Sequence, residues 1–142
     1  MAAPRTAGII VVALLNVLIG LAAGAGSVRM IVDALRASGA SSGGLVPAAA
    51  GLSIGFGAAR LVLGAELVVA GAGVFRIAPW GRTLSLWAAS FWLVLNLVEP
   101  AVLHYSYAQV LIGSIYPLIL VSVCSSPGWK RAFTAPAAPG TA

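Results

Sequence analysis

Three polar side chains, Glu66, Asn16 and Tyr116, lie deep inside apolar stretches of this 142-residue sequence. A carboxyl, an amide and a phenol can exchange hydrogen bonds, and a carboxyl group in hydrocarbon is costly as an ion. Glu66 is therefore either a neutral clasp between helices or a site for a proton or an ion. If the stretches are helices, a rise of about 1.5 Å per residue puts the three side chains at a similar depth, as one polar layer.

Arg60 and Glu99 form a second candidate pair. Each lies sixteen residues from a predicted helix end, at Arg76 and Thr83 respectively, which is a depth of about 24 Å. Neither side chain is stable alone in hydrocarbon, so we expect an interhelical salt bridge between them. Arg60 and Glu66 are a poor pair, because six residues place them roughly 120° apart around a helix.

The other reactive side chains have structural interpretations. His104 stands beside Tyr105 and could titrate near neutral pH, but a lone His at an interface is more typical of a simple interfacial residue. Cys124 is interpreted as a small buried hydrophobe rather than a site of S-acylation. An aromatic stripe in the third stretch is typical of a lipid-facing or core surface rather than a quinone or pigment site: Trp87, Phe91, Trp92 and Leu95.

Several kinds of chemistry are missing from the sequence. A single Cys and a single His exclude a disulfide framework and an intrachain zinc or iron–sulfur site. No segment resembles a P-loop, a nucleophile elbow, a dinucleotide fingerprint or a metal-binding helix. We therefore expect no catalytic residue, no cofactor, no metal and no enzymatic activity. The Lys and Arg residues are scattered over short flanks and form no stripe, so nucleic acid is not an expected partner.

Composition indicates that these residues act in a membrane. Hydrophobic residues make up 61% of the chain and charged residues 8%, whereas an average soluble domain has about 25% charged residues. So few charges cannot cover a soluble fold, and disorder requires low hydrophobicity. The lipid bilayer is the expected partner, and the expected class is an all-α polytopic membrane protein.

Four apolar stretches predict four transmembrane helices, at about residues 7–37, 47–77, 83–99 and 105–125. We expect one domain over 1–130, a four-helix transmembrane bundle of two antiparallel hairpins, followed by a disordered cytoplasmic tail over 131–142. Pro and Gly between Arg76 and Arg82 predict a tight turn. Glu99-Pro100 is expected to end the third helix, because a residue before proline avoids the α region.

Two features of the first hairpin leave alternatives open. Its helices are each 31 residues long, longer than hydrocarbon about 30 Å thick requires, so the hairpin projects roughly 10–15 Å beyond the bilayer. Alternatively, residues 29–35 lie flat on the membrane surface. Residues 1–27 also resemble a secretory signal with a cleavage motif at 23–25, although the helical periodicity continues past that motif.

Positive charges predict the orientation of the chain. Lys and Arg are more frequent in short cytoplasmic flanks. In a four-helix threading, five flank one side, namely Arg5, Arg76, Arg82, Lys130 and Arg131, and two flank the other, namely Arg29 and Arg36. The bias favours a multi-pass protein of the cell inner membrane with both termini in the cytoplasm.

Glycine pairs at a spacing of four residues predict close helix packing. Gly20 and Gly24, and Gly51 and Gly55, are G-x-x-x-G pairs within apolar stretches. Small residues let helix backbones approach each other in lipid. The pairs serve either packing within one chain or a face for a homo-oligomer or a partner membrane protein.

The segment R-I-A-P-W-G-R-T-L-S-L at 76–86 resembles the turn between the second and third helices of small uncharacterised bacterial four-helix integral membrane proteins. The resemblance covers this segment and the four-helix layout. It implies the architecture and a bacterial inner membrane, and it implies no activity.

These patterns favour a non-catalytic role through helix packing, as an accessory subunit or a self-associating module. A second hypothesis is a small proton-coupled or solute transporter that uses Glu66 with Asn16 and Arg60. A third is a membrane-embedded enzyme or cofactor-holding protein that uses Glu66 or His104.

Overall fold

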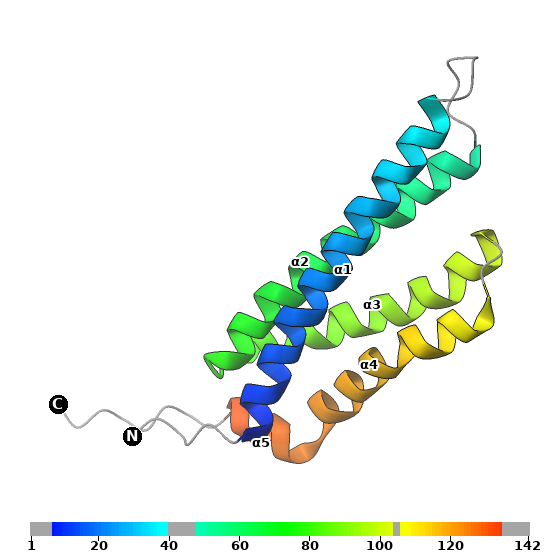
Figure 1. Ribbon diagram of the computed structural model, residues 1–142. Helices are drawn as coiled ribbons and strands as arrows, with labels where there is room; N and C mark the ends of the chain where they lie inside the picture. The colour runs from blue at the N-terminus through cyan, green and yellow to red at the C-terminus, as the bar shows by residue number, and fades with distance from the viewer. Residues whose placement is uncertain (1–6, 40–47, 104–105, 135–142) are drawn as a thin grey trace, which may run out of the picture.

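The computed structural model describes residues 7–39, 48–103 and 106–134, except the side chains of residues 107 and 109. Helices are the only regular secondary structure in the described part, which confirms the all-α prediction there (Figure 1). Its five helices are α1 (Ala7–Gly39), α2 (Ala48–Phe75), α3 (Pro79–Leu103), α4 (Tyr107–Ser125) and α5 (Pro127–Thr134).

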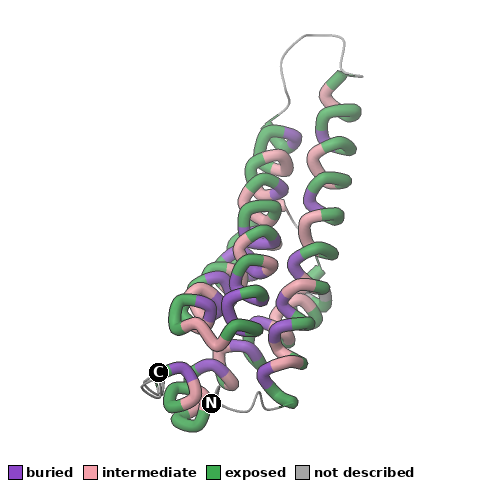
Figure 2. Tube along the Cα trace, turned by 90° about the vertical axis from the view of Figure 1, so that its left-hand side faces the viewer, coloured by how far each residue is buried: buried purple, intermediate pink, exposed green. Residues whose placement is uncertain are grey.

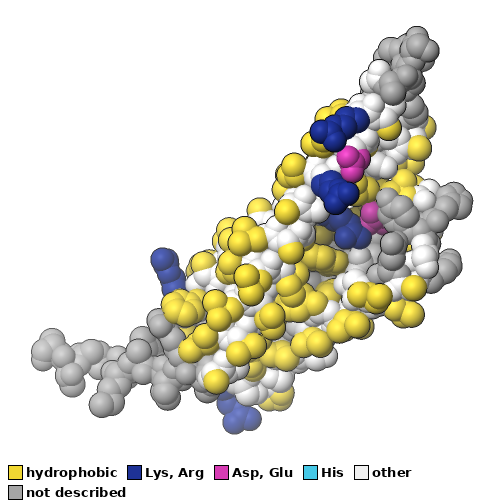
Figure 3. Space-filling view, in the orientation of Figure 1, with side chains coloured by type: hydrophobic (Ala, Val, Ile, Leu, Met, Phe, Trp, Pro, Cys, Tyr) yellow, Lys and Arg dark blue, Asp and Glu magenta, His cyan; other side chains and the backbone are white. Residues whose placement is uncertain are grey.

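The helices are long and apolar enough for a membrane. Within the described ranges, α1, α2 and α3 can each cross a bilayer, and α4 with α5 counts as a fourth span if the 63° bend between them is accepted. Large apolar side chains are exposed, including Leu18, Trp87 and Leu111. Figure 3 shows how much of one face of the molecule is hydrophobic. A water-soluble monomer rarely exposes so large an apolar patch. The chain is a multi-pass membrane protein.

α1 packs on α2 and α3 packs on α4, and within each of these two pairs the helices run in opposite directions (Figure 1). α2 also packs on α3, and α5 folds back to contact α3 and α4. The pairs meet at the end where α1 begins and diverge towards their loops (Figure 1). Buried residues follow the facing sides of the helices, and the outer sides are exposed (Figure 2).

Glycine brings the backbones of α1 and α2 together. A Cβ atom placed on Gly64 would lie 2.7 Å from the carbonyl oxygen of Gly20 and 3.1 Å from the backbone nitrogen of Gly24. Gly51 and Gly55, although in the same helix as Gly64, would have no atom within 4 Å of such a Cβ. The first glycine pair therefore packs within the chain, whereas the second lies on an open face of α2.

A tight turn joins α2 to α3, in the segment where Pro and Gly predict one. The N–H of Ala78 donates to the carbonyl of Gly73 at 2.9 Å, and the N–H of Ile77 donates to that of Val74 at 2.9 Å. Ile77 takes the left-handed conformation, with φ of 56°, which is strained for a β-branched residue. A Cβ on Gly73 would lie 2.7 Å from the Cα of Gly81, so the crossing requires glycine.

The prediction that Glu99-Pro100 ends the third helix is wrong, because α3 continues through Pro100 to Leu103. Proline removes one backbone hydrogen bond. Leaving the helix would expose several unpaired backbone groups, which cost more in an apolar environment than the single missing bond.

The C-terminal boundary also differs from the prediction. Residues 131–134, assigned to a disordered tail, belong to α5, and 135–142 lie outside the described residues. Ser126 caps α5 through its hydroxyl, which accepts from the N–H of Trp129 at 3.4 Å, and Pro127 occupies the first helical position. Phe133 of α5 is buried against Ile9 of α1. α1 itself is one continuous helix through 23–25 and 29–35.

We predict that Gly64→Ala destabilises the protein, whereas Gly55→Ala in the same helix does not. The added methyl at position 64 meets the backbone of Gly20, and overpacking of this kind costs about 1–3 kcal/mol. The measurement is unfolding by denaturing detergent in mild-detergent micelles. Equal stability of the two variants would contradict the packing described for α1 and α2.

Candidate functional site

An open cleft of about 710 Å³ lies between the two helical pairs. One wall is α1 from Ile19 to Asp33, and the opposite wall is formed by α3 and α4. Arg60 reaches the cleft from α2. Lys or Arg and Asp or Glu side chains lie close together in this part of the surface, and further Lys or Arg side chains lie at the opposite end (Figure 3).

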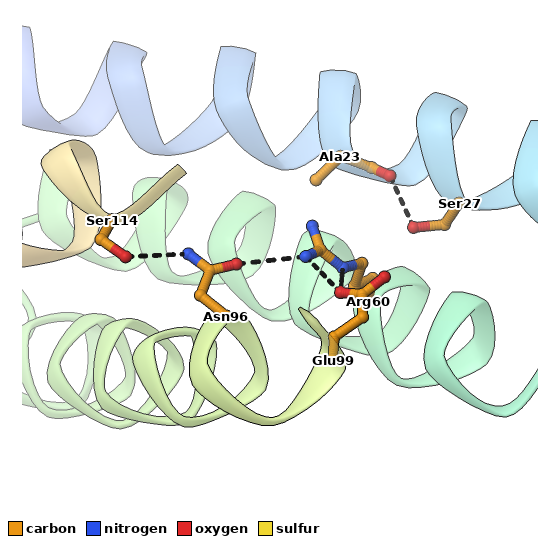
Figure 4. Close-up of polar contacts among 6 residues, drawn as sticks. All are labelled: Ala23, Ser27, Arg60, Asn96, Glu99 and Ser114. Atoms are coloured by element: carbon orange, nitrogen blue, oxygen red, sulfur yellow. Dashed lines mark hydrogen bonds and ion pairs between the residues drawn. The ribbon is translucent and has the colours of Figure 1, made fainter. Parts of the chain in front are cut away.

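An ion pair with a hydrogen-bonded amide forms the polar part of the cleft (Figure 4). Arg60 donates from Nε to Oε2 of Glu99 at 2.7 Å, and its Nη2 forms an ion pair with the same oxygen. Nη2 also donates to Oδ1 of Asn96 at 3.1 Å. Asn96 in turn donates from Nδ2 to the hydroxyl of Ser114 at 3.3 Å. These contacts tie α2, α3 and α4 together.

The two charges are unequally covered. The side chain of Glu99 is 3% exposed and that of Arg60 is 30% exposed. A buried carboxylate is stable only with a close partner and further hydrogen bonds, so the guanidinium of Arg60 is what permits Glu99 at this position. Because Arg60 remains partly open to the cleft, a molecule in the cleft could contact it.

Each partner of the ion pair keeps an unused group. Nη1 of Arg60 and Oε1 of Glu99 make no hydrogen bond to any residue that the structure describes, and neither atom carries a dashed line to the other residues drawn in Figure 4. Nη1 carries two N–H donors, and a carboxylate oxygen accepts hydrogen bonds. The cleft therefore offers a donor pair and an acceptor side by side.

Two prolines interrupt helical hydrogen bonds beside the cleft. Pro100 in α3 and Pro117 in α4 lack an N–H, so they cannot donate to the carbonyls four residues earlier, which belong to Asn96 and Gly113. Both Asn96 and Gly113 line the cleft.

Trp92 also lines the cleft, and its indole N–H is buried without an acceptor among the described residues.

A second ion-pair network, weaker than the Arg60–Glu99 pair, lies at the end of the cleft nearer the C-terminus of α1. Arg29 and Arg36 lie 3.7 Å and 3.9 Å from the carboxylate of Asp33, and all three side chains are exposed. Exposed pairs contribute little to stability. They matter for the net charge of the cleft. Arg29 and Asp33 line it together with Arg60 and Glu99, and these four charges sum to zero.

A chain of hydrogen bonds joins the helices beyond the end of the cleft that is nearer the start of α1. The hydroxyl of Tyr116 donates to Oδ1 of Asn16, and Nδ2 of Asn16 donates to the hydroxyl of Ser85 at 3.0 Å. Ser85 then donates to the carbonyl of Gly81 at 2.8 Å. Asn16 is fully buried. This chain joins α4, α1 and α3 about one helical turn from the cleft.

The structure brings some of the predicted residues together and leaves others apart. Arg60 contacts Glu99, and Asn16 contacts Tyr116. Glu66 is half-buried and makes no hydrogen bond or ion pair with a residue that the structure describes. Glu66 is thus not part of the hydrogen-bonded chain between Asn16 and Tyr116.

Other candidates have structural surroundings. Cys124 is fully buried, and its carbonyl accepts from Nε of Arg82 at 2.8 Å, which caps the end of α4. In the aromatic stripe, Trp87 is exposed and Leu95 is buried. His104 lies outside the described residues.

Sequence reasoning missed three polar residues of the site: Asn96, Ser85 and Ser114. The spacing of Asn96 could have revealed it, since it precedes Glu99 by three residues and so shares its helix face. Ser85 and Ser114 gave no comparable signal, because serine is common in apolar helices and only the neighbouring helix gives each of them a side-chain partner.

The side chains at the cleft are suited to binding a polar group. No cluster of three His, Cys, Asp or Glu within the described ranges could hold a metal. No family model, curated protein or solved structure matches the chain. The function is therefore inferred from the geometry of the cleft.

We predict that Arg60→Gln and Glu99→Gln each destabilise the protein, because each leaves the other charge without its counterion. The cost of Glu99→Gln is about 2–3 kcal/mol, less than for a fully buried pair since Arg60 is partly exposed. The double variant should cost less than the sum of the single variants, which unfolding titrations of all four proteins would measure. Additive costs to within about 0.5 kcal/mol would contradict the coupling.

Proposed function

We propose that this chain is a non-catalytic protein of the bacterial inner membrane that holds a small amphipathic molecule in the cleft between its two helical pairs. The observation that carries this proposal is the cleft of about 710 Å³, with apolar walls and the Arg60–Glu99–Asn96 group as its polar part. Ligand sites are usually concave, about 300–1,000 Å³ in volume and mainly apolar, with a few convergent polar groups.

In this proposal the four helices α1 to α4 cross the bilayer as two hairpins, and both termini face the cytoplasm. Arg76 and Arg82 flank the end where the hairpins meet, and Lys130 and Arg131 lie in α5 at the same end. The positive-inside rule puts that end in the cytoplasm. The cleft then opens towards the opposite leaflet.

The hydrogen bonds that join the helices beyond the cleft favour a small molecule over a partner helix as the ligand. A transmembrane helix would need a groove that runs the full depth of about 30 Å of hydrocarbon. The hydrogen bonds of Asn16 with Tyr116 and Ser85 join the walls about one turn beyond the cleft. A molecule with a polar head at Arg60 and an apolar body suits a cleft that ends in this way.

The cleft supports binding better than bond-making. Arg60 and Glu99 neutralise each other. Ser27, which lines the cleft, donates its hydroxyl to the carbonyl of Ala23 at 2.7 Å (Figure 4) and has no His, Asp or Glu bonded to it among the residues described. A nucleophile needs an adjacent base, so a non-catalytic role is the better interpretation.

We predict that Gly26→Trp empties the cleft, whereas Ala25→Trp on the neighbouring exposed position does not. Gly26 lines the cleft, and a Cβ there would meet no atom within 4 Å, so a larger side chain can be added at the edge of the cleft without displacing the backbone. The probe is an extract of host phospholipids, and native mass spectrometry of the protein in mild detergent counts the bound molecules. Gly26→Trp should retain at least about fivefold less than the wild-type protein.

The matched variant controls for the general effect of a new Trp at the lipid-facing surface. Unfolding titrations establish that both variants keep the wild-type stability. Equal retention by wild-type protein, Gly26→Trp and Ala25→Trp would overturn the proposed ligand site.

Self-association through α2 is a second candidate role, favoured by one observation. Gly51, Gly55 and Glu66 fall within roughly 60° on one side of the helix, and the two glycines are exposed. Glu66, half-buried on the same side, would lie against its own copy across a two-fold axis, where the small residues let the helices approach.

This candidate predicts that Gly55→Leu and Glu66→Leu each lower the dimeric fraction, with Ala25→Leu on α1 as the control. Energy transfer between labelled chains in vesicles, measured as the lipid-to-protein ratio is raised, reports association. If energy transfer is the same for the control and for both α2 variants, self-association through α2 is wrong. The proposed ligand site in the cleft would not be affected.

A further inference from the structure

We infer that the cleft selects a phospholipid whose headgroup carries an anionic phosphodiester beside a primary ammonium group. This inference rests on the proposed function, because it names the class of molecule that the cleft holds. Four features of the cleft carry it: the charge balance, the free donors of Arg60, the surplus of acceptors, and the apolar walls.

The charge balance selects a ligand without net charge. Arg29, Asp33, Arg60 and Glu99 are the charged side chains among the described residues that line the cleft, and they sum to zero. A ligand of net charge would bring an uncompensated charge into a region of low dielectric constant. A zwitterion brings two charges that each find an opposite partner in the Arg60–Glu99 pair.

Arg60 provides the contact for the anionic half. Its Nε and Nη2 are occupied by Glu99 and Asn96, and the two N–H groups of Nη1 are free among the described residues. A guanidinium in a fixed position is a preferred partner for phosphate oxygens. Its side chain is 30% exposed, so a phosphodiester in the cleft can contact it.

The acceptors select a primary ammonium over a quaternary one. Oε1 of Glu99 makes no hydrogen bond within the described part of the chain, and Pro100 and Pro117 deprive the carbonyls of Asn96 and Gly113 of their helical donors. A primary ammonium has three N–H donors for such acceptors, whereas a trimethylammonium group has none. Recognition of a quaternary group instead requires an aromatic cage, and Trp92 is the one aromatic residue lining this cleft among those described.

The walls favour a lipid over a free headgroup. Ile19, Met30 and Val110 line the cleft beside the polar group, and acyl chains are the apolar material that a bilayer supplies. A soluble phosphoethanolamine would leave these walls without apolar contacts. The whole lipid therefore should bind more tightly than its headgroup alone.

The test compares three phospholipids with identical acyl chains, titrated into the delipidated full-length protein in mild detergent and followed by native mass spectrometry. The headgroups are phosphoethanolamine, phosphocholine and phosphoglycerol. We expect the ethanolamine lipid to bind at least about fivefold more tightly than either of the others. Equal affinities, or tightest binding of the anionic glycerol lipid, would overturn the inference.

Two variants separate recognition of the headgroup from stability. Glu99→Gln gives the lining a net charge of +1, so the preference should move to the glycerol lipid. Pro100→Ala changes no charge and returns an N–H donor to the carbonyl of Asn96, so it should reduce the preference for ethanolamine over choline by about two- to threefold. Because Pro100→Ala restores a helical hydrogen bond, it should fold even if Glu99→Gln does not. If Pro100→Ala keeps the wild-type headgroup preference, the carbonyl of Asn96 does not contribute to headgroup selection. If both variants keep the wild-type preference, the inference is wrong.

The remaining measurements distinguish this inference from the proposed function. If Gly26→Trp lowers the binding of all three lipids equally while the wild-type protein shows no preference, the cleft binds lipid and only the headgroup selection fails. If Gly26→Trp leaves all binding unchanged, the proposed function fails. If soluble phosphoethanolamine binds as tightly as the lipid, the ligand need not be a lipid, but the inferred headgroup chemistry stands.

Discussion

The cost of a charge in an apolar interior is the constraint on which the rest of this structure depends. Glu99 is almost completely buried, and it is stable there because Arg60 of the neighbouring helix supplies two contacts to the same carboxylate oxygen. The pair fixes the register of α2 against α3, and Asn96 extends the connection to α4 through Ser114. Because a guanidinium has more donors than Glu99 and Asn96 can occupy, the pair leaves part of Arg60 open, and the cleft lies at that open part.

The cleft exists because the helices pack by two different means. α1 and α2 approach closely through glycine, with Gly64 against the backbone of Gly20, so α1 is held on α2 along its length. α1 meets α3 and α4 near its N-terminal end, through Asn16. Beyond that point the first pair continues in its own direction and the second pair diverges (Figure 1). In lipid there is no hydrophobic force that would pull the walls together, so an open cleft is not penalised as it would be in water.

A bilayer also changes the meaning of the exposed surface. Leu111 and Ile112 are each 71% exposed, which would be a liability in water and is the ordinary state of a lipid-facing helix. The polar groups then carry the specificity, because few of them are present and each one in hydrocarbon needs a partner. The unused atoms of Arg60 and Glu99, and the carbonyls opposite the two prolines, are therefore the basis of the proposed recognition of a zwitterionic headgroup.

The sequence by itself determined the helical class and most helix positions, since long apolar runs have one stable backbone conformation in hydrocarbon. It also predicted the Arg60–Glu99 pair, because depth along a helix follows from residue number alone. It did not predict that α3 continues through Pro100, that Gly51 and Gly55 face outwards, or that Glu66 lies apart from Asn16. Those outcomes depend on the direction in which each side chain points around its helix and on which neighbour lies there. Only the packing of all the helices together decides that, because rotation about a helix axis leaves the depth of every residue unchanged.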